Sequence, residues 1–132
     1  MNWMRAIGGG ILAELLLIVV LMPVVFAFYD LDTLQNPDNL PLAIAVIIVA
    51  GSFLMPALLT QWVAKRATSR LVLHGLLVGF TAFVVYATPM LVAGEHQPPL
   101  YWVAHAMKIL GGLCGGFIAA RRLATRGTAV PV

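Results

Sequence analysis

Apolar residues fall into four long blocks along the chain, and short polar stretches separate the blocks. The blocks run over residues 6–29, 40–64, 70–93 and 100–120. Each block has about the ~20 residues that a helix needs to cross the hydrocarbon core of a bilayer. None shows the alternation of apolar and polar positions that is typical of barrel strands. The pattern therefore predicts an all-α integral membrane protein whose four spans form a helical bundle.

The composition also favours a membrane protein. The 132 residues are 61% hydrophobic and 10% charged, whereas a soluble domain is closer to half apolar and a quarter charged. The length predicts a single transmembrane domain over residues 1–132. The net charge of +3 does not indicate nucleic-acid binding, because the basic residues flank the spans and do not form one basic face.

The loops on the two sides of the spans differ in the sign of their charge. Basic residues lie before the first span, between the second and third, and after the fourth: Arg5, Lys65, Arg66, Arg70, Arg121, Arg122 and Arg126. Acidic residues lie in the other two loops: Asp30, Asp32, Asp38 and Glu95. By the positive-inside rule, the basic side is cytoplasmic. We therefore predict a multi-pass protein of the bacterial inner membrane with both termini in the cytoplasm.

The order of the spans suggests two tandem helical hairpins. Pro23 and Pro89 lie late in the first and third spans, and similar basic segments follow the second and fourth spans, at residues 65–68 and 121–125. Any two hairpins that obey the positive-inside rule share such basic segments. Duplication and coincidence therefore both remain open.

The third and fourth spans carry glycines at the spacing that is typical of close helix contacts. These glycines are Gly75 and Gly79 in the third span and Gly111, Gly112, Gly115 and Gly116 in the fourth. Glycine lets another backbone approach closely, so we expect tight packing along this part of the bundle. The spacing does not tell whether the partner helix belongs to the same chain or to a second copy.

Two charged residues lie inside the spans: Glu14 in the first and Lys108 in the fourth. Glu14 lies about 12 Å from the cytoplasmic end of its span, and Lys108 lies about 12 Å from the outer end of its span. In a ~30 Å core their depths therefore differ by roughly 6 Å. A single charge at this depth costs about 2.5–3.5 kcal/mol. One interpretation is a buried ion pair that fixes how the first and fourth spans pack. Another is a protonatable Glu14 in a polar cavity used for transport. Two further interpretations are that Lys108 extends to the membrane interface and that each charge meets another subunit.

Few other side chains offer chemistry. His105 and Tyr101 lie on the same helical face as Lys108 and are candidate polar neighbours, whereas His74 is expected at the membrane interface. No His, Cys and carboxylate set has the spacing of a metal site, and no set of nucleophile, base and acid is present. We therefore expect no metal, no cofactor and no enzymatic activity.

The segment Gly8-Gly9-Gly10-Ile11-Leu12-Ala13-Glu14 resembles the first helix of the small multidrug resistance family. Members of that family are also short, four-span proteins, and their glutamate is a shared site for protons and cations. The resemblance implies this role for Glu14. The end of the fourth span, residues 112–121, is similar to the last helix of many small four-span bacterial membrane proteins, which implies no function.

These observations lead to two hypotheses about function. The first is a non-enzymatic membrane bundle that forms homo-oligomers or is an accessory subunit of a membrane complex, with lipid and membrane proteins as its partners. The alternative is a small proton-coupled transporter that uses Glu14. A wet polar cavity around Glu14 would favour transport, whereas a closed contact between Glu14 and Lys108 with an exposed glycine-rich face would favour the subunit.

Overall fold

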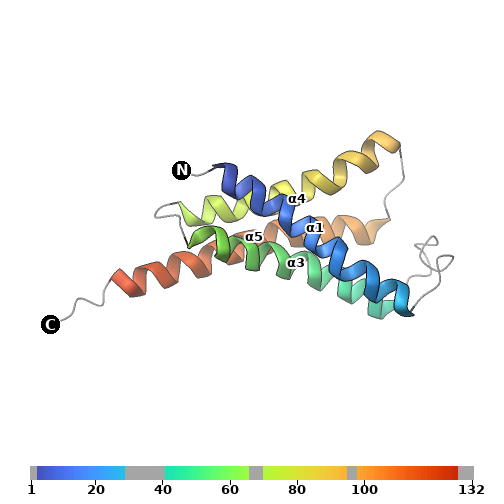
Figure 1. Cartoon of the computed structure of the whole chain (residues 1–132), viewed down its shortest axis with the longest axis horizontal. Helices are drawn as coiled ribbons and strands as arrows, with labels where there is room; N and C mark the ends of the chain where they lie inside the picture. The colour runs from blue at the N-terminus through green and yellow to red at the C-terminus, as the bar shows by residue number, and fades with distance from the viewer. Residues whose placement is uncertain (1–2, 29–40, 66–69, 95–97, 128–132) are drawn as a thin grey trace.

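The computed structural model describes residues 3–28, 41–65, 70–94 and 98–127, and every regular element in these ranges is an α-helix. Figure 1 shows these helices, which are α1 (Trp3–Phe28), α3 (Leu42–Ala64), α4 (Leu71–Ala93) and α5 (Pro99–Gly127). All 4 are long and apolar enough to cross a membrane. The chain is therefore an all-α, multi-pass membrane protein, as its sequence predicts.

The helix ends lie close to the predicted limits of the spans except at the end of α5. We expected the fourth span to end at residue 120, but the helix continues to Gly127. Helix formation does not stop at the membrane, and Arg121, Arg122, Leu123 and Ala124 all favour a helix. α4 ends at Ala93 and is capped by Gly94, whose φ of 69° is the left-handed conformation that glycine adopts easily. The predicted acidic loops lie outside the described residues.

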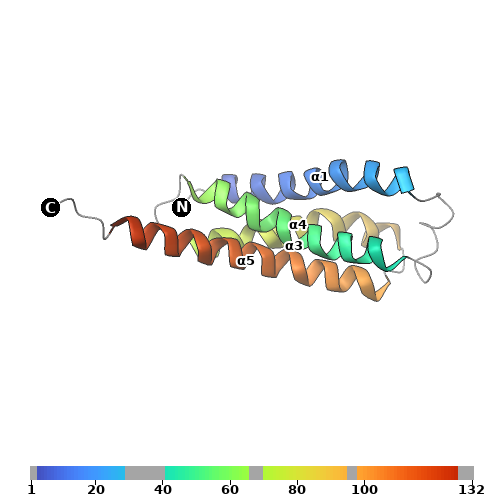
Figure 2. The ribbon, with the colours of Figure 1, turned by 90° about the horizontal axis from the view of Figure 1, so that it is seen from below.

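The helices form a bundle in which α3 and α4 occupy the middle. α1 packs against α3 and α4, and α5 packs against the same two helices from the other side. Figure 2 shows α1 and α5 on opposite sides of the bundle. The first and last helices are therefore separated by the α3–α4 pair along most of their length.

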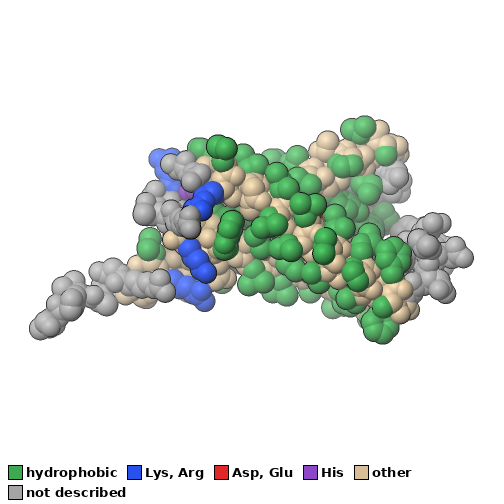
Figure 3. Space-filling view, in the orientation of Figure 1, with side chains coloured by type: hydrophobic (Ala, Val, Ile, Leu, Met, Phe, Trp, Pro, Cys, Tyr) green, Lys and Arg blue, Asp and Glu red, His purple; other side chains and the backbone are tan. Residues whose placement is uncertain are grey.

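Basic and apolar side chains occupy different zones of the surface. In Figure 3 the Lys and Arg side chains that are visible on the surface gather at one end of the molecule, and hydrophobic side chains cover the surface beyond them. At this end, which we call the basic end, Arg122 of α5 donates a hydrogen bond of 2.8 Å from its Nη1 to Oε1 of Gln61 in α3. Large apolar side chains such as Leu58 and Phe117 are more than half exposed. An apolar surface of this kind is suited to contact with lipid.

One row of glycines in α5 lies directly against α3. A Cβ atom at Gly111 would collide with the carbonyl oxygen of Phe53, and a Cβ at Gly115 would lie 2.5 Å from the carbonyl oxygen of Ala57. Real Cβ atoms do not approach backbone this closely, so these positions accept only glycine unless the helices move apart.

The second row of glycines in α5 lies against α4. Gly112 faces Gly75 so closely that a Cβ on either residue would collide with the carbonyl oxygen of the other. A Cβ at Gly79 would collide with the carbonyl oxygen of Lys108, and one at Gly116 would lie 2.8 Å from that of Leu71. The two overlapping glycine rows of α5 thus each contact a different helix of the same chain.

The helices are less closely packed toward the other end. α1 is near α4 at Gly10, where a Cβ would lie 2.5 Å from Cβ of Thr81. Beyond this point the two helices diverge, and in Figure 1 the last turns of α1 and α4 lie well apart. We call the part of the bundle from the basic end to Gly10, Gly79 and Gly112 the basic half, and the remainder the cavity half.

Candidate functional site

An ion pair lies inside the bundle where the two halves meet. Nζ of Lys108 is 2.7 Å from Oε2 of Glu14, and the two side chains are only 4% and 3% exposed. Each charge is removed from lipid and solvent, so each depends on the other for compensation. The structure therefore brings together the two charged residues that lie within the spans.

This ion pair connects two helices that do not lie side by side. Glu14 comes from α1 and Lys108 from α5, and α3 and α4 lie between these helices over most of the bundle. One sequence-based interpretation was a buried ion pair that fixes how the first and fourth spans pack. The structure places the pair in the middle of the bundle, where it joins helices on opposite sides.

A cluster of aromatic rings contacts Lys108 through Tyr86. Its Nζ lies 4.7 Å from the ring centroid of Tyr86 in α4, which is within the range of a cation–π interaction. Tyr86 stacks on Tyr101 with 6.0 Å between the ring centroids, and His105 lies 5.3 Å from Tyr86. The predicted neighbours His105 and Tyr101 thus belong to the surroundings of Lys108, and His105 is itself buried.

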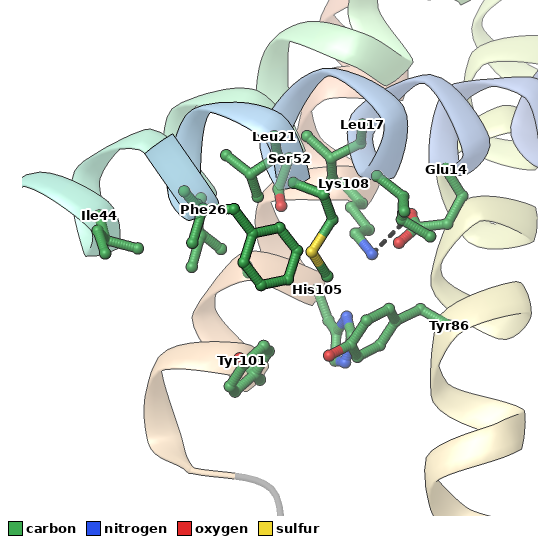
Figure 4. A pocket seen from close by; sticks show the side chains of 15 residues that line it. Glu14, Leu17, Leu21, Phe26, Ile44, Ser52, Tyr86, Tyr101, His105 and Lys108 are labelled. Atoms are coloured by element: carbon green, nitrogen blue, oxygen red, sulfur yellow. Dashed lines mark ion pairs between the residues drawn. The ribbon is translucent and has the colours of Figure 1, made fainter. Parts of the chain in front are cut away.

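A cavity of about 290 Å³ extends from the ion pair through the cavity half. Figure 4 shows the side chains around it, with Glu14 and Lys108 joined by the dashed line at one end and Ile44, Phe26 and Tyr101 farther away. Its polar lining consists of Glu14, Ser52, Tyr86, Tyr101, His105 and Lys108. Most of the remaining lining is aliphatic and comes from α1 and α3, including Leu17, Leu21, Met22, Val25, Ile44 and Ile48.

The sequence analysis did not single out Ser52 or Thr60, both of which are buried in α3. Ser52, Pro56 and Thr60 follow one another at intervals of four residues, so they lie on one face of the helix. That periodicity was a signal in the sequence that could have identified a buried face of α3. Ser52 lines the cavity, whereas the side chain of Thr60 lies near Gly75 and Gly115 in the basic half.

His74, which we expected at the depth of the membrane interface, is buried between helices near the basic end. Its side chain is 1% exposed, and its Nδ1 lies 2.9 Å from the carbonyl oxygen of Arg70. Within the described ranges, Nε2 of His74 and Oγ1 of Thr60 lack a hydrogen-bond partner. The tight packing of the basic half therefore leaves two polar atoms unsatisfied.

The cavity has the features of a site that binds a small molecule. No group of three or more His, Cys, Asp or Glu among the described residues could hold a metal ion. Ligand sites are typically concave and mostly apolar, with a few polar groups that fix orientation, and their volumes begin at about 300 Å³. The cavity has this character, and its charged groups lie together at one end.

Comparisons of the chain with protein families, with curated proteins and with solved structures found no match. The site must therefore be interpreted from its own geometry.

Proposed function

We propose that this membrane protein binds a small molecule in the cavity beside Glu14 and Lys108 and moves it across the membrane as a small transporter. One observation carries the proposal: the cavity ends at a buried ion pair, and tightly packed glycines lie beyond the pair. A site that is near the middle of the membrane and closed on one side is the usual arrangement in secondary transporters. The role is non-enzymatic.

Glu14 is the residue that would couple transport to protons. Acidic residues inside spans are rare, and they commonly mark proton or substrate pathways. Protonation would remove the negative charge beside Lys108 and so change what the cavity can bind. This role agrees with what the resemblance of residues 8–14 to the small multidrug resistance family implies.

The charge distribution supports an orientation in the bacterial inner membrane with both termini in the cytoplasm. The basic side chains visible on the surface cluster at one end (Figure 3), and the positive-inside rule assigns that end to the cytoplasm. In this orientation the cavity half belongs to the outer leaflet. The proposal of two tandem hairpins, α1 with α3 and α4 with α5, rests on the sequence pattern alone.

A second candidate is an accessory or oligomerising subunit of a membrane complex. The closed contact of 2.7 Å between Glu14 and Lys108 favours it, because a closed pair can serve purely to hold α1 and α5 together. The glycines of α4 and α5 give it no support, because they contact helices of the same chain. The candidates also overlap: four helices enclose little volume, so a complete transport path would use a second copy or another subunit.

A cavity-filling variant tests the proposal. Leu21→Trp places a large ring in the cavity, and Val20→Trp, on the exposed face of the same helix, is the matched control. We would screen small amphipathic solutes of each charge class for thermal stabilisation of the purified protein. Stabilisation of wild type and Val20→Trp but not of Leu21→Trp is the expected result. Uptake of the active solute into proteoliposomes should then respond to a pH gradient, and Glu14→Gln should abolish that response.

The opposite results would favour the second candidate. If no charge class stabilises wild type more than Leu21→Trp, the cavity is not a binding site. Native mass spectrometry would then show whether the 14.2 kDa chain is released from the membrane as an oligomer.

A further inference from the structure

The charges that line the cavity balance one another. Glu14 supplies one negative charge and Lys108 one positive charge, and the other titratable side chains in the lining are His105, Tyr86 and Tyr101. With these three neutral, the lining has no net charge. The cavity thus offers both signs of charge at one place and an excess of neither.

A ligand with a single charge would upset this balance. A cation could approach Glu14 and an anion could approach Lys108, but either would leave a net charge among apolar side chains inside the membrane. Uncompensated charge in such surroundings is strongly unfavourable. A ligand that fits the cavity therefore carries either no charge or one charge of each sign.

The ion pair leaves hydrogen-bonding atoms that a ligand with one charge of each sign could use. The contact joins Oε2 of Glu14 to Nζ of Lys108, while a carboxylate has two oxygens and an ammonium group has three N–H donors. A ligand ammonium group beside the carboxylate and a ligand acid group beside Lys108 would give four alternating charges. This arrangement does not require the contact of 2.7 Å to open. Charge-assisted hydrogen bonds of this kind are about twice as strong as neutral ones.

We infer that the cavity binds a small zwitterion with an apolar side chain, of the size and chemistry of an apolar α-amino acid. This inference rests on the proposed function and specifies its ligand. The aliphatic walls from Leu17 to Val25 of α1 provide the surface for the apolar side chain. The volume of about 290 Å³ gives enough room for a molecule of the size of leucine.

Four probes with the same branched apolar chain test the inference by calorimetry on the full-length protein in nanodiscs. Leucine is the zwitterion, isoamylamine the cation, 4-methylpentanoate the anion and 4-methylpentanamide the uncharged probe. We expect leucine to bind at least about tenfold more tightly than each of the others, which is the scale of one added charge-assisted hydrogen bond.

Two double variants show whether the ion pair causes this preference. Glu14→Gln with Lys108→Met keeps the cavity neutral but removes both charges, so leucine should lose its advantage while 4-methylpentanamide is unaffected. Glu14→Lys with Lys108→Glu keeps both charges, and leucine should remain the best probe. Thermal unfolding first establishes that each double variant is folded.

The outcomes separate this inference from the proposed function. If another probe binds as tightly as leucine and Leu21→Trp abolishes that binding, the cavity is a binding site but the zwitterion preference is wrong. If none of the four probes binds, the inference is overturned, and the solute screen against Leu21→Trp decides separately whether the proposed function fails. If leucine binds best in the charge-free double variant too, the ion pair does not select the ligand, and the inference is overturned.

Discussion

The basic half and the cavity half differ in how closely the helices pack around their buried polar side chains. In the basic half the backbones touch at Gly75 and Gly112, and Thr60 and His74 each have a buried polar atom without a partner in the described ranges. In the cavity half the polar side chains are spread around a space of about 290 Å³. The difference indicates that close glycine packing provides cohesion, whereas the looser half provides the room that a ligand requires.

The ion pair lies where the basic half and the cavity half meet. Loss of one of its two residues should have the largest effect on the stability of the protein. Removing one member of a buried pair leaves the other charge uncompensated, which typically costs about 3–5 kcal/mol. Lys108→Met should therefore destabilise the protein on this scale in thermal or denaturant unfolding in detergent. Leu110→Met, on the exposed face of α5, is the control and should be close to neutral.

Adding Glu14→Gln to Lys108→Met should recover much of this loss, because no stranded charge then remains. A double variant as unstable as the sum of the two single variants would show that the charges do not interact.

Enlarging a glycine in the basic half should have the next largest effect. Gly112→Ala forces Cβ against the carbonyl oxygen of Gly75, and two helix backbones must separate to relieve the collision. We expect a loss of about 3 kcal/mol, at the upper end of the usual range for overpacking. Gly8→Ala is the matched control, because a Cβ there meets nothing within 4 Å and alanine favours a helix. Equal melting temperatures for the two variants would contradict the tight packing.

Enlarging a side chain in the cavity half should have the opposite effect and stabilise the protein. Leu21→Trp adds apolar surface to existing space, and cavity filling commonly stabilises a protein by about 0.5–2 kcal/mol. Val20→Trp, which faces outward, should change the stability by less than about 0.5 kcal/mol. Destabilisation by Leu21→Trp that matches that of Gly112→Ala would show that the two halves are equally close-packed.

Removing the hydroxyl group of Thr60 should have the smallest effect on the stability of the protein. Its Oγ1 is buried with no partner among the described residues, and replacing an unsatisfied polar group by an apolar one of the same shape is neutral or stabilising. Thr60→Val should therefore raise the stability, by about 1 kcal/mol. Thr88→Val on the exposed face of α4 should change it little. Clear destabilisation by Thr60→Val would mean that a bound water or a ligand uses this hydroxyl.

The sequence predicts the four spans and the unusual charges well, because insertion in lipid requires long apolar blocks and penalises isolated charges. Glu14 and Lys108 were recognisable as potential partners from depth alone. The sequence did not predict that the pair joins helices on opposite sides of the bundle. Apolar side chains cover every side of a membrane helix, so they give little information about how the helix is rotated. For the same reason the sequence did not reveal that the glycine rows of α5 contact α3 and α4, or that His74 is buried.

The most direct test of the central claim measures access to the two halves. In a Cys114→Ser background, we would compare the reaction of N-ethylmaleimide with Ile48→Cys, which lines the cavity, and Thr60→Cys, which lies in the basic half. We predict that Ile48→Cys reacts faster by an order of magnitude or more, because a buried thiol without access is inert. Equal rates at the two positions would contradict an accessible cavity beside the ion pair.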